Sequence, residues 1–187
     1  MAAPETPSPD DRPSQWTEDL DETSVSVADR ARRLVGRAAG LLERGEASRA
    51  IPLLERAVQL DSSSVPALIN LGGAYTMSGR FRDAIPLLES ARDAEPQNPM
   101  IWINLGAAYL GNPVLATPEK QMRAIRAFEK ALELNPAAPN VHYNLGLIFV
   151  DRKETDLATA AFRQAIQVNP LDRDAHYWLR KLEEWDE

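Results

Sequence analysis

The stretch Val65–Asn98, VPALINLGGAYTMSGRFRDAIPLLESARDAEPQN, decides the fold of this chain. Both of its halves repeat apolar residues at spacings of three and four, the pattern of a helix with one apolar face. These residues are Leu68, Leu71, Ala74 and Tyr75 in the first half, and Ala84, Leu88 and Ala91 in the second. Gly79 and Pro96 should end the two helices, because glycine favours helix ends and proline disfavours helical geometry in the residue before it. The stretch therefore predicts a helical hairpin.

The same pattern returns along the chain at a regular interval. Gly72 and Gly106 each stand in the string INLG, and Gly146 stands in YNLG after a longer interval. The second helices carry alanines at matching positions, again with a longer interval between the second and the third; they are Ala50, Ala84, Ala124 and Ala158. One short insertion in the third repeat explains both long intervals. The repetition predicts four hairpins stacked in one direction.

These residues resemble the tetratricopeptide repeat family, whose repeat combines a large residue, Leu-Gly, aromatic and small residues, and a proline. The matching residues are Leu68, Leu71, Gly72, Tyr75, Ala84, Leu88, Ala91 and Pro96 in the second repeat; Trp102, Leu105, Gly106, Tyr109, Ala124, Phe128, Ala131 and Pro136 in the third; and His142, Leu145, Gly146, Phe149, Ala158, Phe162, Ala165 and Pro170 in the fourth. The first repeat departs from the pattern at Arg37 and Ser62. The resemblance implies an all-α solenoid of four hairpins and a role in protein binding.

The chain divides into a tail and a repeat domain. Residues 1–24 combine four prolines with seven acids and one base, so we expect a disordered acidic tail. Residues 25–187 should form the domain, with repeats at about 31–64, 65–98, 99–138 and 139–172 and a C-terminal capping helix over 172–185. Arg180 stands where the repeats place glycine, so no second helix should pack against that last helix.

Composition excludes several classes of function. The 187 residues carry a net charge of −7 and no cysteine, which excludes disulfides and thiolate chemistry and fits a reducing, cytoplasmic location. Residues 1–24 hold −6 of that charge, so the rest is close to neutral and lacks the clustered cations that nucleic acid requires. We therefore expect no nucleic-acid partner. No apolar run is long enough to span a membrane, and no secretory signal is apparent.

No residue pattern points to catalysis or to a cofactor. His142 and His176 align with Leu68 and Trp102, which favours packing roles over a metal pair or acid–base chemistry. The repeat glycines lie inside predicted helices without a preceding strand or a GK[ST] string, so a phosphate loop is not expected. We predict a protein that is not an enzyme and binds no metal.

The resemblance implies that the residue two before each repeat glycine faces a concave groove. Those residues are Asn70, Asn104 and Asn144, with Gly36 in the first repeat. Amides can donate to and accept from the backbone of an extended peptide. The alternative is that asparagine belongs to the repeat pattern without contacting a ligand.

Amides alone would bind weakly, since each hydrogen bond contributes about 0.5–1.5 kcal/mol against the roughly 8 kcal/mol of a micromolar complex. Apolar residues predicted to line the groove are Ile69, Met77, Met100, Ile103, Leu110, Tyr143, Leu147, Val150, Tyr177, Trp178 and Trp185. Core packing is the competing role for the two tryptophans. The basic residues with which some family members hold a terminal carboxylate are replaced by Val35, Met100 and Asn104, so we expect a ligand with apolar anchors.

Two features leave alternatives open. Trp16 and Leu20 stand four apart in the acidic tail, and they either have no role or dock in the groove of their own or a neighbouring copy. The insertion at 111–118 is either a tolerated loop or a partner contact, and Pro118 should begin a helix about one turn longer than its counterparts. The leading hypothesis is an adaptor that binds a peptide segment of a partner protein. Self-association is the alternative.

Overall fold

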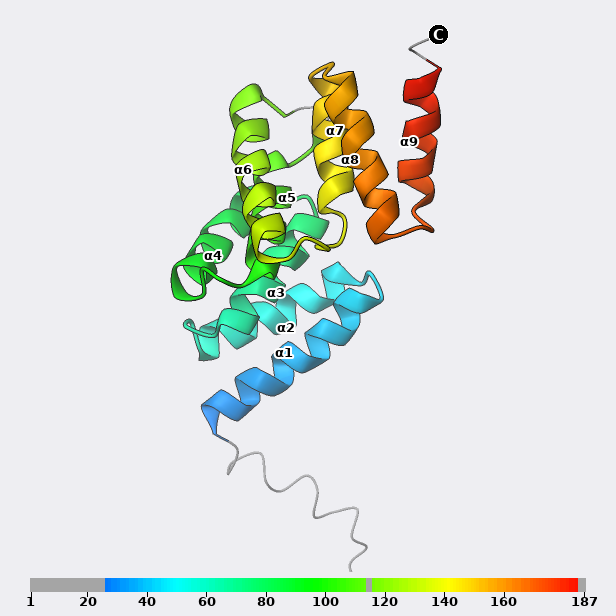
Figure 1. The fold of residues 1–187 in the computed structure, drawn as a ribbon. Helices are drawn as coiled ribbons and strands as arrows, with labels where there is room; N and C mark the ends of the chain where they lie inside the picture. Colours follow the sequence, from blue (N-terminus) through cyan, green and yellow to red (C-terminus); the bar gives the residue numbers. More distant parts are fainter. Residues whose placement is uncertain (1–25, 114–115, 185–187) are drawn as a thin grey trace, which may run out of the picture.

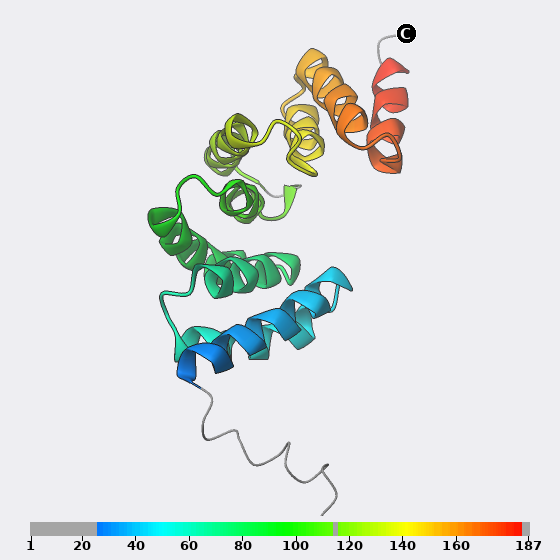
Figure 2. The same cartoon turned by 60° about the horizontal axis from the view of Figure 1, so that its bottom comes forward.

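The computed structural model describes residues 26–113 and 116–184, and within them every regular element is a helix. The helices are α1 (Val27–Glu43), α2 (Ala47–Leu60), α3 (Val65–Met77), α4 (Phe81–Ala94), α5 (Pro99–Leu110), α6 (Pro118–Leu134), α7 (Val141–Asp151), α8 (Thr155–Val168) and α9 (Arg173–Glu183). Figure 1 shows them as successive antiparallel pairs followed by the single helix α9. Figure 2 shows the pairs rising as steps of one solenoid. The predicted fold of four hairpins and a C-terminal helix is confirmed.

Within each of the last three hairpins, a glycine lets the two helices approach closely. A Cβ atom placed on Gly72 would lie 2.5 Å from Leu88 Cγ, and one on Gly146 would lie 2.6 Å from the Phe162 ring. A Cβ on Gly106 would overlap the ring of Phe128, whose side chain is fully buried. The large residue of the second helix therefore occupies the space that glycine leaves on the first.

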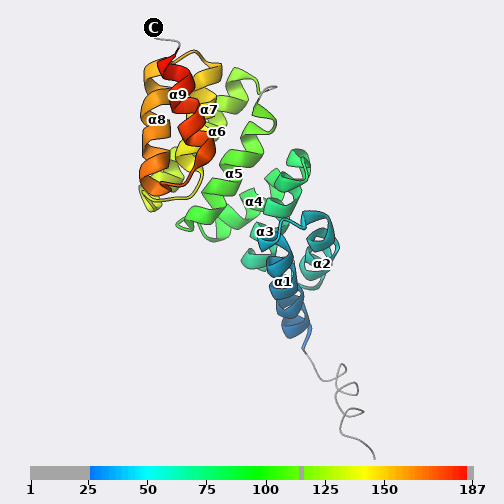
Figure 3. The same ribbon diagram turned by 90° about the vertical axis from the view of Figure 1, so that its right-hand side faces the viewer.

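The hairpins stack on one another less evenly than the sequence repeat suggests. Helices α1, α3 and α5 contact each other in order, and α2 packs on α3 as α4 does on α5. Helix α6 packs on α7 more sparsely than α2 packs on α3 or α4 packs on α5. Figure 3 shows α7, α8 and α9 grouped beyond α5 and α6. The core follows this division, since Phe162 and Leu182 belong to a separate cluster that also contains Ala158, Ala165 and Ala175.

The insertion lies where α5 ends and α6 begins. Gly111 ends α5 with a φ of 66°, a conformation that glycine adopts without strain. Helix α6 begins at Pro118 and has 17 residues, against 14 in each of α2, α4 and α8. The longer helix predicted from the sequence is therefore confirmed. Pro52 and Pro86 lie inside α2 and α4, as their positions in the sequence require.

Helix α9 completes the described part of the chain. The side chain of Asp172 accepts hydrogen bonds from the backbone N–H groups of Asp174 and Ala175, which begins the helix. Its Ala175 and Leu182 are buried against α8, while Arg180 is exposed. None of the described helices is long and apolar enough to cross a membrane.

Candidate functional site

Three asparagines occupy the same place in three successive first helices. Asn70 lies on α3, Asn104 on α5 and Asn144 on α7, and each is half-buried. A Cβ placed on Gly73 would lie 3.5 Å from Asn104 Nδ2, so the Asn104 amide lies against α3. The side-chain amide of Asn104 therefore lies on the side of α5 that adjoins another first helix, α3, rather than toward the second helices.

The apolar residues predicted for the groove fall into two groups. Met77, Met100 and Tyr177 are exposed to 56%, 47% and 50%, so they are available to a ligand. Half-buried side chains that pack against the two core clusters form the second group: Ile69, Ile103, Tyr143, Leu147, Val150 and Trp178. These can offer only part of their surface.

Two of the groove predictions need separate comment. Leu110 is 3% exposed and lies in the core, so its assignment to the groove was wrong. The reason is that α5 ends at Leu110, where the chain turns into the insertion and the side chain packs inward. Trp185 lies outside the described residues, as do Trp16 and Leu20 in the predicted tail.

An aromatic cluster at the C-terminal end explains the half-buried state of Trp178. Its ring stacks on Phe162 with centroids 6.0 Å apart and an interplanar angle of 3°, and Tyr177 meets its edge at 5.8 Å. Tyr143 lies 5.8 Å from the same Phe162 ring, and burial raises the pKa of its phenol. Lys181 Nζ lies 5.0 Å from the Trp178 ring centroid, within cation–π range. Packing and ligand contact can therefore both apply to this surface.

A recurring polar contact joins the first three hairpins. Tyr75 donates to Glu55 at 2.6 Å and Tyr109 donates to Glu89 at 2.7 Å, each across a junction between repeats. Arginine covers each ring, with Arg80 at 3.9 Å from the Tyr75 centroid and Arg123 at 4.0 Å from that of Tyr109. The contact was missed in the sequence. The signal that could have revealed it is that the two glutamates are separated by the same interval as the two tyrosines.

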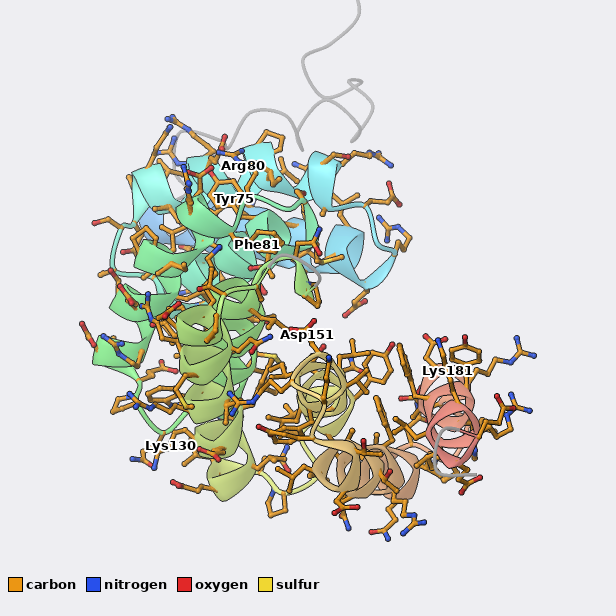
Figure 4. All side chains as sticks on the ribbon, turned by 90° about the horizontal axis from the view of Figure 1, so that it is seen from above. Tyr75, Arg80, Phe81, Lys130, Asp151 and Lys181 are labelled. Atoms are coloured by element: carbon orange, nitrogen blue, oxygen red, sulfur yellow. The ribbon has the colours of Figure 1, made fainter. Side chains whose placement is uncertain are left out.

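The fourth hairpin is joined by a different contact. Phe149 stands at the place of these tyrosines in α7 and has no hydroxyl to donate. Instead, Gln121 Nε2 donates to Asp151 Oδ2 at 2.6 Å. Gln121 is 3% exposed and is the one buried polar side chain among the described residues, while Asp151 is exposed at the end of α7. Figure 4 shows Asp151 on the side of α7 that faces α5 and α6.

The two tyrosines at the junctions lead to a prediction about alkaline pH. Burial, followed by the hydrogen bond to glutamate, raises the pKa of both Tyr75 and Tyr109. The folded state thus favours the neutral phenol, and this contribution to stability should be complete below the ordinary phenol pKa and lost as the pH rises through the raised values. In a spectrophotometric titration, phenolate absorbance should show a late component, and that component should be smaller in Tyr75→Phe/Tyr109→Phe, in which Tyr143 is the remaining phenol with a raised pKa. An unchanged titration curve for the double variant would contradict this assignment.

The histidines have structural partners. His142 Nε2 lies 3.4 Å from the Pro136 carbonyl oxygen, and His176 Nε2 lies 3.0 Å from that of Pro170. Trp102 Nε1 donates to the Pro96 carbonyl at 2.8 Å in the same way. All three therefore tie the start of a helix, α5, α7 or α9, to the loop before it. Among the described residues, no cluster of His, Asp and Glu could hold a metal ion.

Comparison with known proteins agrees with this architecture. Profiles described as tetratricopeptide or TPR repeats match residues 41–103, 120–151 and 139–170. No curated protein matches the chain. Solved structures share the fold at low sequence identity.

A TPR protein, TTC0263 of Thermus thermophilus, is 21% identical over 81% of this chain and 80% of its own, with a TM-score of 0.69. A MamA RS-1 double mutant is 18% identical over 87% and 88%, with a TM-score of 0.68. YrrB, described as a TPR protein with an unusual peptide-binding site, is 22% identical over 91% and 83%, with a TM-score of 0.61. With three family profiles spread along it and the packing of glycine against a large residue in its hairpins, the chain belongs to the tetratricopeptide repeat family.

Proposed function

We propose that this chain is a protein–protein interaction adaptor that binds an extended peptide segment of a partner along α3, α5 and α7. The observation that carries the proposal is the placement of Asn70, Asn104 and Asn144 at one position of three successive first helices. The peptide-binding site named for YrrB supports a binding role for this fold. We assign no catalytic step to the chain and propose that it acts in the cytoplasm, with which its cysteine-free composition is compatible.

The amides would fix the backbone of the ligand. An asparagine side chain donates through its NH₂ group and accepts through its carbonyl, so it can pair with a peptide N–H and C=O whatever the ligand's side chains are. Affinity and selectivity would then come from apolar anchors against the exposed residues Met77, Met100 and Tyr177. Methionine adapts to different shapes, so this surface suits ligands with aliphatic or aromatic anchors.

The groove can be tested with peptides selected from a random display library on the wild-type protein. Asn104→Ala/Asn144→Ala should weaken the selected peptides about tenfold or more, because two backbone contacts of about 0.5–1.5 kcal/mol each are lost. A matched control is Gln164→Ala/Gln167→Ala, which removes two exposed amides from α8. Dissociation constants measured by fluorescence anisotropy give the comparison. Equal affinities for both double variants would remove the asparagines from the binding site.

A further inference from the structure

A cavity of about 540 Å³ lies at the insertion, away from the asparagine series. Its walls come from three elements: the turn into α4, the end of α5 and the first turns of α6. Lys120 and Arg123 belong to α6, which begins immediately after the insertion and has the extra turn. The insertion therefore helps to build this cavity at the junction of the second and third hairpins.

Two aromatic rings give the cavity an apolar lining. Phe81 is half-buried, and its ring lies 3.4 Å from the position of a Cβ atom on Gly111. Tyr109 lines the cavity as well, and its hydroxyl donates a hydrogen bond to Glu89, which fixes the position of the ring. Figure 4 shows Phe81 near Arg80 and Tyr75. A flat or branched apolar side chain could rest between Phe81 and Tyr109.

The charged residues of the cavity are mostly cationic. The lining holds four cations, Arg80, Arg82, Lys120 and Arg123, and one carboxylate, Asp83. Arg80 is paired with Asp83 at 2.8 Å, and Arg123 with Glu89 at 3.3 Å. Arg82 and Lys120 are exposed and make no hydrogen bond or ion pair with any other described residue. Their two charges are therefore available to an acidic ligand.

The chain itself contains a segment of matching chemistry. Residues 1–24 carry a charge of −6, whereas the rest of the chain is close to neutral. Within that segment Trp16 and Leu20 supply apolar side chains, with Glu18, Asp19 and Asp21 beside them. The groove on α3, α5 and α7 offers amides and methionines instead of cations, so charge complementarity favours the cavity.

We propose that the N-terminal segment docks in this cavity, with Trp16 against Phe81 and Tyr109 and its acids against Arg82 and Lys120. The same contacts can be made by the segment of the same copy or of a neighbouring one. The inference does not depend on the proposed peptide groove. The cavity is lined by residues around α4, α5 and α6, and none of the three asparagines that define the groove is among them. Docking there would leave the asparagine series free for a partner.

The test uses full-length protein whose own N-terminal segment can no longer compete for the cavity. The substitutions Trp16→Ala, Leu20→Ala, Asp19→Asn and Asp21→Asn remove its two apolar side chains and two of its charges. A fluorescein-labelled peptide of residues 10–24 is titrated into this variant and binding is followed by anisotropy. Adding Arg82→Glu and Lys120→Glu should weaken the peptide at least tenfold. The control pair Arg163→Glu and Arg173→Glu makes the same change in net charge at exposed positions of α8 and α9, and should stay within about twofold of the parent.

Further arms separate the possible outcomes. A peptide carrying Trp16→Ala should also bind at least tenfold more weakly, because the aromatic contact is lost. Equal weakening by the cavity and control pairs, or no binding of the peptide, would overturn the proposal. Loss of binding on Asn104→Ala/Asn144→Ala with the cavity pair unaffected would place the segment in the groove and would equally overturn it. Circular dichroism of each variant confirms that the helices are intact.

Discussion

Replacing Phe128 by alanine is expected to lower the free energy of unfolding by about 3–5 kcal/mol. Its side chain is fully buried in the larger core cluster and fills the space above Gly106, so truncation leaves a cavity between α5 and α6. Urea unfolding followed by circular dichroism measures the change. Leu157→Ala, at a residue 50% exposed on α8, is the matched control and should cost far less.

The same pair of residues gives an internal check. Gly106→Ala alone should destabilise the protein, because the added Cβ would overlap the Phe128 ring. In the Phe128→Ala background the new methyl group has room, so the cost of Gly106→Ala should fall and the two changes should be less than additive. Strict additivity would mean that glycine is present at this position for another reason.

Asp151→Ala is expected to destabilise the C-terminal hairpin by about 1–3 kcal/mol, the cost of leaving a buried polar group without its partner. The group concerned is the Gln121 amide, which is 3% exposed and donates to Asp151 at 2.6 Å. Hydrogen exchange followed by mass spectrometry should show that Asp151→Ala accelerates exchange, relative to the wild-type protein, more in α7, α8 and α9 than in α3 and α4. The effect should be local because α6 packs only sparsely on α7.

The reverse change separates this hydrogen bond from general packing. Gln121→Leu keeps a side chain of similar size and leaves Asp151 free to be hydrated, since Asp151 is exposed. It should therefore cost less than Asp151→Ala, although both remove the same hydrogen bond. A larger effect of Gln121→Leu, or uniform acceleration of exchange along the whole chain, would contradict this account of the junction.

The hairpins could be predicted from sequence because their determinants are local and repeated. Gly72, Gly106 and Gly146 each oppose a large residue one helix later, and that pairing fixes both the helix type and the register. The longer α6 was also predictable, since Pro118 suits the first turn of a helix. The insertion explains why Tyr109 and Phe149, rather than Tyr109 and Tyr143, hold equivalent places.

The site was less accessible to sequence reasoning, because exposure depends on how neighbouring hairpins stack. Leu110 follows the groove pattern of its helix, yet the turn at Gly111 places it in the core. Trp178 is held by stacking on Phe162, a contact between α9 and α8. Gln121 looks like an ordinary surface residue of a helix in the sequence, yet in the fold it is buried and donates to Asp151 of α7. The orientation of Asn104 toward α3 likewise depends on the stack.

The guanidinium of Arg180 limits how copies of this protein could join. A second molecule stacked end to end on α9 would have to bring a helix against Arg180, at the place where the repeats use glycine for close approach. Burying this guanidinium without a carboxylate opposite it would cost more than the new apolar contact returns. Lengthening of the solenoid through α9 would therefore require an acidic residue of the second molecule opposite Arg180, whereas contacts through the sides of the superhelix carry no such requirement.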